Sequence, residues 1–195
     1  MSPMNEWKRK LLHLVLGTIL LILYAEGLVS ATHLWFLAGI GALVSLGQYL
    51  SPLAAIAWFL DRFDREESIP GRGAITFIAG LAICALFPRE IALAAMAMLV
   101  WGDGTAALVG TYVGQRRLWQ GKTVEGSISF LLFGFAAAWA FVSTITAYSA
   151  AIVGTIVELI PLPKGSKWNP GDILDDNILV PLIVGIVLTL STVFF

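Results

Sequence analysis

Residues 91–114 read IALAAMAMLVWGDGTAALVGTYVG, and the only charged side chain among them is that of Asp103. A helix needs roughly 20 apolar residues to cross the hydrocarbon of a bilayer, so this stretch predicts a transmembrane helix. A carboxylate inside such a helix costs several kcal/mol unless it faces a polar cavity, a cation or a partner. Asp103 is therefore the first candidate for a functional residue.

The composition of the whole chain agrees with a membrane protein. Of the 195 residues, 58% are hydrophobic and 13% are charged, whereas globular proteins average about 25% charged residues. The net charge of −1 and the lack of an arginine-rich groove exclude a typical nucleic-acid-binding protein. Cys84 is the single cysteine, so no disulfide framework exists. We expect residues 1–195 to form one all-α domain, a polytopic bundle of transmembrane helices.

The charge-free runs predict about seven spans. The boundary between the fifth and sixth is placed near Ala147, within the uncharged stretch from Glu125 to Glu158. The other five predicted spans cover residues 11–25, 33–50, 73–87, 91–114 and 178–195.

Lysine and arginine predict the orientation of these spans, because cytoplasmic loops are enriched in both. Eleven of the twelve basic residues lie in segments 1–10, 51–72, 115–125 and 161–177, and only Arg89 lies elsewhere. The predicted N-terminus is therefore cytoplasmic and the C-terminus outside.

Lys8-Arg9-Lys10 and the following apolar run also resemble a signal peptide. That run is long for a signal peptide and more spans follow it, so we favour a membrane anchor.

Segment 51–67 has a different pattern, in which aromatic residues such as Trp58 and Phe63 alternate with charged residues such as Asp61 and Arg65. This pattern is typical of an amphipathic helix at the cytoplasmic membrane surface. A solvated loop with aromatic anchors is the alternative.

Small residues recur every four positions around Asp103, at Gly102, Ala106, Gly110 and Gly114. Such a ridge is common where membrane helices pack closely, which is the structural interpretation. Packing alone does not explain Asp103. A match of Gly102 and Gly104 to a dinucleotide fingerprint carries no weight, because no strand precedes it.

Gly121-Lys122-Thr123-Val124-Glu125-Gly126-Ser127 forms a second candidate site. It is not a P-loop, because Arg116 stands where that motif needs its first glycine. Lys122 and nearby backbone N–H groups still favour phosphate binding, and Glu125 is a candidate magnesium ligand. The alternative is a basic loop that anchors the inner surface.

Acidic residues gather before the last span, and oxygen ligands of this kind suit a hard cation such as Mg²⁺. The alternative is a solvated turn that caps the last helix. Asp172 fits a cap well, whereas the adjacent carboxylates of Asp175 and Asp176 repel each other unless a cation or proton lies between them. The cluster comprises Glu158, Asp172, Asp175, Asp176 and Asn177.

His13, Arg72 and His33 are lesser candidates. His13 lies one turn into the first span and either touches phosphate or bonds to a neighbouring helix. Arg72 is a positive-inside anchor or a phosphate contact, and the anchor is favoured. His33 is interpreted as a residue of the outer interface.

In this order the motifs resemble the CTP-dependent lipid kinases, the family of dolichol kinase, phytol kinase and the CTP-using diacylglycerol kinase. The resemblance spans residues 9–181. The residues that carry it are Arg9-Lys10-Leu11-Leu12-His13, Gly102-Asp103-Gly104-Thr105-Ala106, Gly110, Gly114, Lys122-Thr123-Val124-Glu125-Gly126-Ser127, Glu158, Pro161, Asp175-Asp176-Asn177 and Pro181.

The resemblance implies transfer of the γ-phosphate of CTP to the hydroxyl of a membrane lipid alcohol, with Mg²⁺ as cofactor. Asp175 or Asp176 is the expected general base. The expected metal ligands are Asp103, Glu125, Asp175 and Asp176, and Lys122 is expected to balance phosphate charge. The expected nucleotide-binding residues are Gly102, Gly104, Gly110, Gly114, Arg116, Arg117, Lys122, Thr123, Gly126, Ser127 and Asn177.

Two other functions remain as alternatives. The middle of the chain is also similar to phosphatidate cytidylyltransferases, but it lacks their C-terminal His-Gly-Gly signature, since no histidine follows His33. A small transporter is the non-enzymatic alternative. It is disfavoured because the carboxylates and lysines gather at one membrane face rather than at the midplane.

The acceptor remains open among dolichol or another polyprenol, phytol, geranylgeraniol and diacylglycerol. A homodimer through the glycine ridge is possible.

Overall fold

The computed structural model describes residues 3–63, 69–160 and 175–194, and within these ranges the chain is helical. The first four helices are α1 (Pro3–Ala25), α2 (Ala31–Leu50), α3 (Ala54–Phe63) and α4 (Arg72–Cys84). A long central helix follows, made of α5 (Arg89–Ala97), the π-helix η1 (Met98–Asp103) and α6 (Gly104–Tyr112). The short 3₁₀ turn η2 (Trp119–Gly121) precedes α7 (Val124–Trp139), α8 (Thr144–Glu158) and α9 (Asp176–Phe194).

Two of the described helices are long and apolar enough to cross a bilayer, Ala31–Leu50 and the continuous helix Arg89–Tyr112. Their bounds agree within two residues with the spans predicted at 33–50 and 91–114. Four further apolar helices are shorter: Arg72–Cys84, Val124–Trp139, Thr144–Glu158 and Asp176–Thr192. The number of seven spans and the orientation of the termini stay predictions.

The break within the uncharged stretch lies earlier than predicted. We placed it near Ala147, but α7 ends at Trp139 and α8 begins at Thr144, so that Ala147 is buried within α8. Ser143 starts α8 as its N-cap, and its Oγ accepts a hydrogen bond from the Thr146 backbone N–H at 3.3 Å. Serine is a favoured N-cap, so the signal was present in the sequence.

Within the predicted amphipathic segment 51–67, a helix covers Ala54–Phe63, which favours the helical interpretation over the loop for these residues. Trp58 and Phe59 are exposed on it. Asp64 and Arg65 lie outside the described residues.

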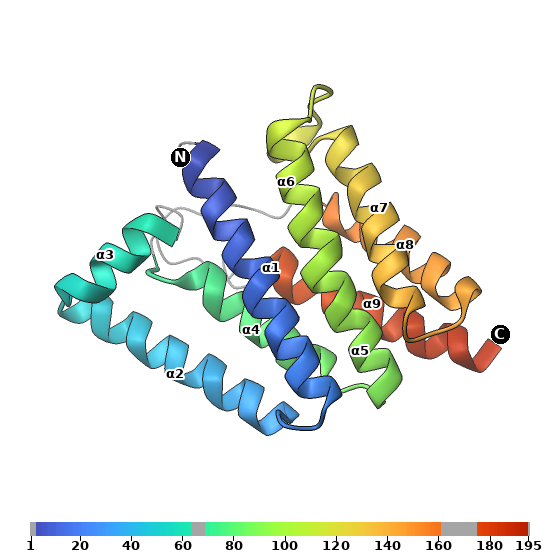
Figure 1. Ribbon diagram of the computed structural model, residues 1–195, viewed down its shortest axis with the longest axis horizontal. Helices are drawn as coiled ribbons and strands as arrows, with labels where there is room; N and C mark the ends of the chain where they lie inside the picture. The colour runs from blue at the N-terminus through green and yellow to red at the C-terminus, as the bar shows by residue number, and fades with distance from the viewer. Residues whose placement is uncertain (1–2, 64–68, 161–174, 195) are drawn as a thin grey trace.

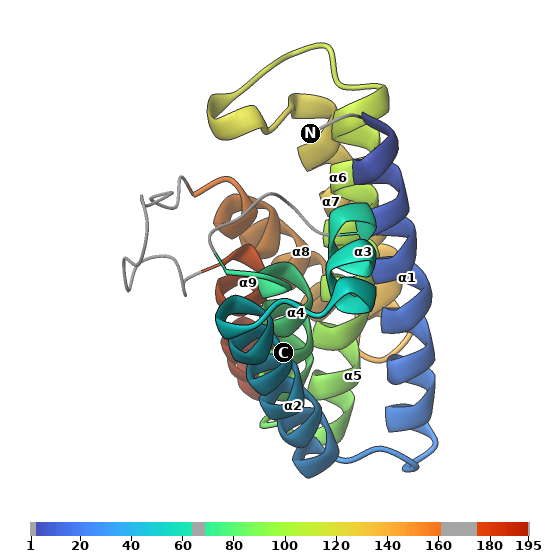
Figure 2. The same ribbon diagram turned by 90° about the vertical axis from the view of Figure 1, so that its left-hand side faces the viewer.

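The bundle is built around the central helix. Figures 1 and 2 show α1 and α7 running alongside α5 and α6, with α4 and α9 behind them. Met98 and Val100 of η1 are completely buried, as are Phe130 of α7 and Val184 of α9. α2 packs mainly on α4 and leaves most of its apolar surface exposed.

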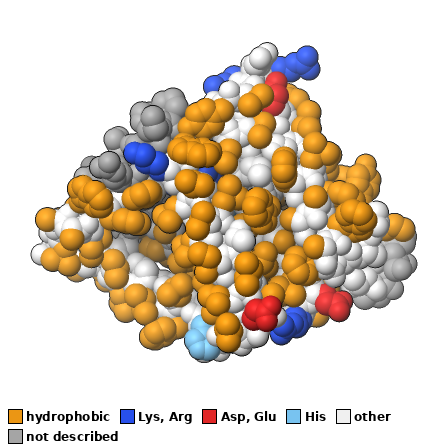
Figure 3. All heavy atoms as spheres, viewed as in Figure 1, with side chains coloured by type: hydrophobic (Ala, Val, Ile, Leu, Met, Phe, Trp, Pro, Cys, Tyr) orange, Lys and Arg blue, Asp and Glu red, His pale blue; other side chains and the backbone are white. Residues whose placement is uncertain are grey.

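Apolar side chains cover the outside of the molecule, while several charged side chains are buried. In Figure 3 hydrophobic side chains cover the middle of the visible face, and charged side chains gather towards its upper and lower edges. Lys10 and Glu158 are only 4% and 5% exposed, whereas Phe36 and Leu43 of α2 are 69% and 70% exposed. An apolar surface of this extent is typical of a membrane or protein interface.

A Gly80→Ala substitution is expected to destabilise the contact between α4 and α9. A Cβ at position 80 would lie 2.0 Å from the backbone oxygen of Asn177 and 3.0 Å from Leu99 Cδ2. The helices would have to move apart, and overpacking of this kind costs about 1–3 kcal/mol. Thermal unfolding in detergent measures the effect.

Gly39→Ala in α2 is the matched control, because nothing lies within 4 Å of the added Cβ. Its helix is expected to gain up to about 1 kcal/mol from the higher helix propensity of alanine. Equal unfolding temperatures for the two variants would show that the α4–α9 contact is not tight.

Candidate active site

Charged and polar side chains from distant parts of the sequence meet inside the bundle, and we call this group the polar cluster. It receives residues from α1, α4, η1, the connection before α7, the last turn of α8 and the start of α9. Its members are Lys10, His13, Thr76, Asp103, Lys122, Glu158, Asp175, Asp176 and Asn177.

A buried ion pair forms the first part of the cluster. Lys10 Nζ donates to Asp103 Oδ2 at 2.6 Å, and the two side chains are only 6% and 10% exposed. His13 Nε2 lies 3.8 Å from the same carboxylate oxygen and 3.3 Å from the backbone oxygen of Leu99. A carboxylate buried at this depth requires a partner, and Lys10 of α1 is the partner of Asp103.

The backbone at Asp103 is a π-helix, which covers Met98–Asp103. π-Helical turns within α-helices occur frequently at functional sites, because the widened turn shifts side chains relative to the regular helix. Here the segment ends at Asp103, and its Leu99 carbonyl oxygen lies within hydrogen-bond distance of His13. The transmembrane helix predicted over residues 91–114 did not include this feature.

Lys122 forms the second part of the cluster, between two carboxylates. Its Nζ donates to Glu158 Oε1 at 2.5 Å and to Asp176 Oδ2 at 2.7 Å. Burial acts to lower the pKa of Lys122, but the charges of Asp176 and Glu158 outweigh burial and raise that pKa above its ordinary value. Lys122 is therefore a permanent cation at neutral pH. Asp103 is also coupled electrostatically to Lys122, which links the two ion-pair groups.

The connection between α6 and α7 holds Lys122 through its backbone. Leu118 N–H donates to the Lys122 carbonyl at 2.8 Å, and Val124 N–H donates to the Arg116 carbonyl at 3.0 Å. Gln120 and Gly121 have positive φ values of 52° and 81°, which reverse the chain just before the lysine.

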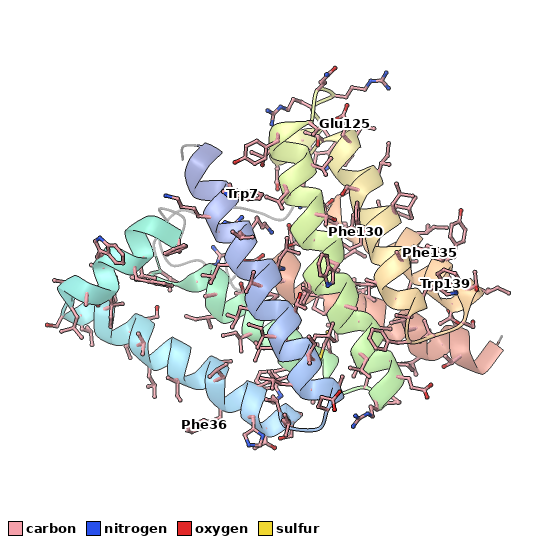
Figure 4. All side chains as sticks on the ribbon, in the orientation of Figure 1. Trp7, Phe36, Glu125, Phe130, Phe135 and Trp139 are labelled. Atoms are coloured by element: carbon pink, nitrogen blue, oxygen red, sulfur yellow. The ribbon has the colours of Figure 1, made fainter. Side chains whose placement is uncertain are left out.

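Glu125 lies in the first turn of α7, beside the connection from α6 (Figure 4). Its carboxylate accepts hydrogen bonds from the backbone N–H groups of Gln115 at 3.2 Å and Arg116 at 3.3 Å. The side chains of Arg116 and Arg117 are exposed on the same connection. In this structure Glu125 therefore stabilises the loop that presents Lys122.

Thr123 and three glycines make the contact between α6 and α7. The Thr123 Oγ1 accepts from the Gly126 backbone N–H at 3.1 Å and is the N-cap of α7. A Cβ at Gly110 or Gly126 would lie 3.0 Å from that oxygen, and one at Gly114 would lie 2.8 Å from it. Close packing therefore accounts for these glycines, and any nucleotide contact of theirs stays a prediction.

Three other predicted nucleotide-binding residues also have local structural partners. A Cβ at Gly102 would lie 3.3 Å from the ring of Phe130, and one at Gly104 would lie 2.6 Å from Leu14 Cδ2. Ser127 Oγ donates to the Thr123 carbonyl at 3.1 Å.

Thr76 of α4 joins the start of α9 to the cluster. Its Oγ1 donates to Asp175 Oδ2 at 3.1 Å and accepts from Asn177 Nδ2 at 3.2 Å. The Asn177 backbone N–H donates to Asp175 Oδ1 at 3.3 Å, so Asp175 also caps α9. Asp175 therefore caps α9 and belongs to the polar cluster at the same time, so the two interpretations of this segment are compatible.

The four predicted metal ligands do not form one site in the structure. Among the described residues, no group of three or more His, Cys, Asp and Glu side chains could hold a metal ion. Lysines pair with Asp103 and Asp176, and Glu125 bonds to the backbone. Asp172 lies outside the described residues.

Our sequence-based site set lacked Lys10 and Thr76. Lys10 precedes His13 by three residues, and this spacing places both on one face of a helix. We had interpreted Lys10 as an orientation signal and as part of the Arg9–His13 motif, without a role in the site. Thr76 gave no signal, since a threonine in an apolar run is ordinary. Arg72, a candidate, is half-buried at the first residue of α4.

Comparisons with known proteins identify relatives along most of the chain. An uncharacterised protein of Methanocaldococcus jannaschii is 24% identical over 190 residues, which are 95% of this chain and 93% of that protein. Phytol kinase 1, chloroplastic, of Arabidopsis thaliana is 26% identical over 89% of this chain. CTP-dependent diacylglycerol kinase 1 of Saccharomyces cerevisiae is 25% identical over 96% of it. No family model and no solved structure matches.

Two of these relatives are thus lipid kinases by name, and both are longer than the present chain. The chain spans 62% of the Arabidopsis protein and 65% of the yeast protein. The relatives support a lipid kinase among the functions that the sequence left open and do not favour the cytidylyltransferase alternative.

Proposed function

We propose that this protein is a membrane-embedded kinase that transfers the γ-phosphate of CTP to the hydroxyl of a lipid alcohol. The observation that carries the proposal is the position of Lys122. This cation is held between Glu158 and Asp176 at one end of an apolar bundle, in a chain similar to two lipid kinases. Phosphoryl transfer needs mainly positioning and charge neutralisation, and such a cluster can supply both.

Lys122 is suited to bind a phosphate oxygen while it keeps its two carboxylate partners. An ammonium group has three N–H donors, and its contacts with Glu158 and Asp176 use two of them. The third would donate to the triphosphate. Arg116 and Arg117, exposed on the same connection, would balance further phosphate charge.

Magnesium fits the site only with fewer protein ligands than the sequence suggested. Mg²⁺ commonly uses one or two carboxylates together with substrate phosphates. Asp175 and Asp176, adjacent at the start of α9, are the residues that would hold it beside the nucleotide. When bound, the ion would neutralise charge on the β- and γ-phosphates.

The proposed membrane arrangement has the polar cluster at the cytoplasmic face. CTP would then enter from the cytosol, while the lipid would approach laterally along the exposed apolar surface of the bundle. The names of the relatives favour a phytol-type prenol or diacylglycerol as acceptor, and a dolichol-type polyprenol remains within the proposal.

Labelled CTP tests the proposal. Detergent-purified protein would be incubated with Mg²⁺, a panel of prenols and diacylglycerol, and CTP labelled at either the γ- or the α-phosphate. We expect label from the γ position in the organic phase. Transfer from the α position to phosphatidic acid would instead identify a cytidylyltransferase, and no transfer from either position would contradict catalysis and require transport assays.

A further inference from the structure

One carboxylate oxygen in the polar cluster has an unmet hydrogen-bonding requirement. Glu158 is 5% exposed, and its Oε1 accepts from Lys122. Its Oε2 is buried and has no hydrogen-bond partner among the described residues. No function in the proposal above uses this atom.

A buried acceptor without a partner is costly, and in native proteins such an atom usually indicates a bound water, ion or ligand. The energetic cost is greater for a charged group than for a neutral one. The binding partner of Glu158 Oε2 is therefore expected to be a hydrogen-bond donor or a cation that enters the site.

The surroundings favour a neutral donor. The ammonium group of Lys122 lies 2.5 Å from the other oxygen of the same carboxylate. Oε1 thus already has a cation, and Oε2 lacks only a hydrogen-bond donor, which a hydroxyl group provides without adding a charge beside the ammonium group. An alcohol O–H also supplies one donor, which is what the one unpartnered atom needs.

The position of Glu158 also suits an amphiphilic ligand. It is the last residue of α8, and Ile152, Ile156 and Ile160 along the same segment are 37%, 58% and 41% exposed. These isoleucines lie two or six residues from Glu158, which places them on the opposite, outer face of the segment from the buried carboxylate. An amphiphilic molecule at the end of α8 would therefore extend its hydroxyl into the bundle and leave its apolar chain on the outer surface.

We propose that Glu158 binds the hydroxyl of the acceptor lipid through Oε2 and accepts its proton during transfer, an inference that rests on the proposed function. The lipid oxygen forms a bond to the γ-phosphorus, and the bond from that phosphorus to the β–γ bridging oxygen breaks. The O–H bond breaks as well, and its proton passes to Glu158. The products are the lipid monophosphate and CDP, and the carboxyl later releases the proton to solvent.

A Glu158→Gln variant tests this assignment, because the amide keeps the size of the side chain but is a poor proton acceptor. We expect kcat/KM for the lipid alcohol to fall by about 10²-fold, at the low end of the range for general acid–base groups. The Kd for CTP is expected to change much less, because the amide oxygen can still accept from Lys122 and Asp176 keeps its charge. Glu90→Gln, exposed at the start of α5, is the control and is expected to leave both quantities unchanged.

Unchanged kcat/KM for the lipid in Glu158→Gln would overturn the inference. Loss of CTP binding with an unchanged KM for the lipid would also overturn it, because Glu158 would then serve the nucleotide. If thermal unfolding shows that the glutamine variant does not fold, Glu158→Asp provides the same comparison. Aspartate keeps the charge and withdraws the oxygens by one methylene. Unchanged kcat/KM for the lipid, or loss of CTP binding with an unchanged KM for the lipid, would overturn the inference in this variant as well. Absence of γ-phosphate transfer by the unsubstituted protein would overturn the proposed function itself. This outcome differs from failure of the Glu158 assignment, in which the unsubstituted protein still transfers the γ-phosphate.

Discussion

An Asp103→Asn variant is expected to lose both stability and lipid phosphorylation. Lys10 and Asp103 are buried and joined at 2.6 Å, so removal of the carboxylate charge leaves a buried ammonium group without its counter-charge. Breaking a buried ion pair in this way costs about 3–5 kcal/mol. Transfer of the γ-phosphate is expected to fall to background, because the displaced lysine disturbs the neighbouring cluster.

The double variant Lys10→Met/Asp103→Leu separates these two effects. Replacing both members of a buried pair by apolar residues of similar size is often neutral for stability. We therefore expect the double variant to unfold near the temperature of the native protein. It should still transfer no phosphate, because the Asp103 carboxylate that is predicted to take part in catalysis is gone. Thermal unfolding and γ-label transfer in the same detergent measure both. Native stability of Asp103→Asn alone would show that the ion pair does not contribute to the fold.

A Lys122→Met variant is expected to lose lipid phosphorylation by about 10³-fold, comparable to the removal of one preorganised charge or donor from other active sites. The substitution removes the expected phosphate contact and leaves the carboxylates of Glu158 and Asp176 without the cation between them. Binding of CTP should weaken together with transfer. Lys122→Arg is expected to retain part of the activity, because the charge remains but the compact ammonium geometry is lost.

The same residue makes a prediction about pH. Its neighbouring carboxylates raise the pKa of Lys122, so the stabilisation from its charge is complete below the ordinary lysine pKa of about 10.4 and is lost only above that value. Activity that depends on Lys122 should therefore not decline between pH 7 and about 10 through loss of this charge.

Lys8→Met is the control for Lys122→Met, because Lys8 lies outside the polar cluster on the first helix. It should bind CTP and phosphorylate lipid as the native protein does. Equal activity of Lys122→Met and Lys8→Met would contradict a phosphate-binding role for Lys122.

Most of the helices could be predicted from the sequence, because uncharged apolar runs bounded by charged or turn residues have few other structures available. The long helix around Asp103 and the helix at 31–50 are examples. The break between α7 and α8 was missed because no glycine, proline or charge marks it, and the Ser143 cap is a weak signal within an apolar stretch.

The candidate site could be predicted only as a set of residues. The motifs pointed to Lys122, Glu158 and the Asp175-Asp176 pair, and the structure places Lys122 between Glu158 and Asp176. They also pointed to Glu125 as a metal ligand, whereas its carboxylate bonds to the backbone of Gln115 and Arg116. Spacing along the chain does not show which way a side chain points from a loop.

The sequence by itself determined that this chain is apolar and helical and that Asp103 places a costly carboxylate in an apolar helix, and it predicted a phosphate-binding role for Lys122. Composition and local pattern suffice for these conclusions, because burial of apolar surface and the cost of a buried charge depend on residue type. Only the tertiary structure decided which charges are paired, Lys10 with Asp103 and Lys122 with Glu158 and Asp176. These partners are 93, 36 and 54 residues apart, and helix packing, which depends on the shapes of all the side chains together, is what brings them into contact.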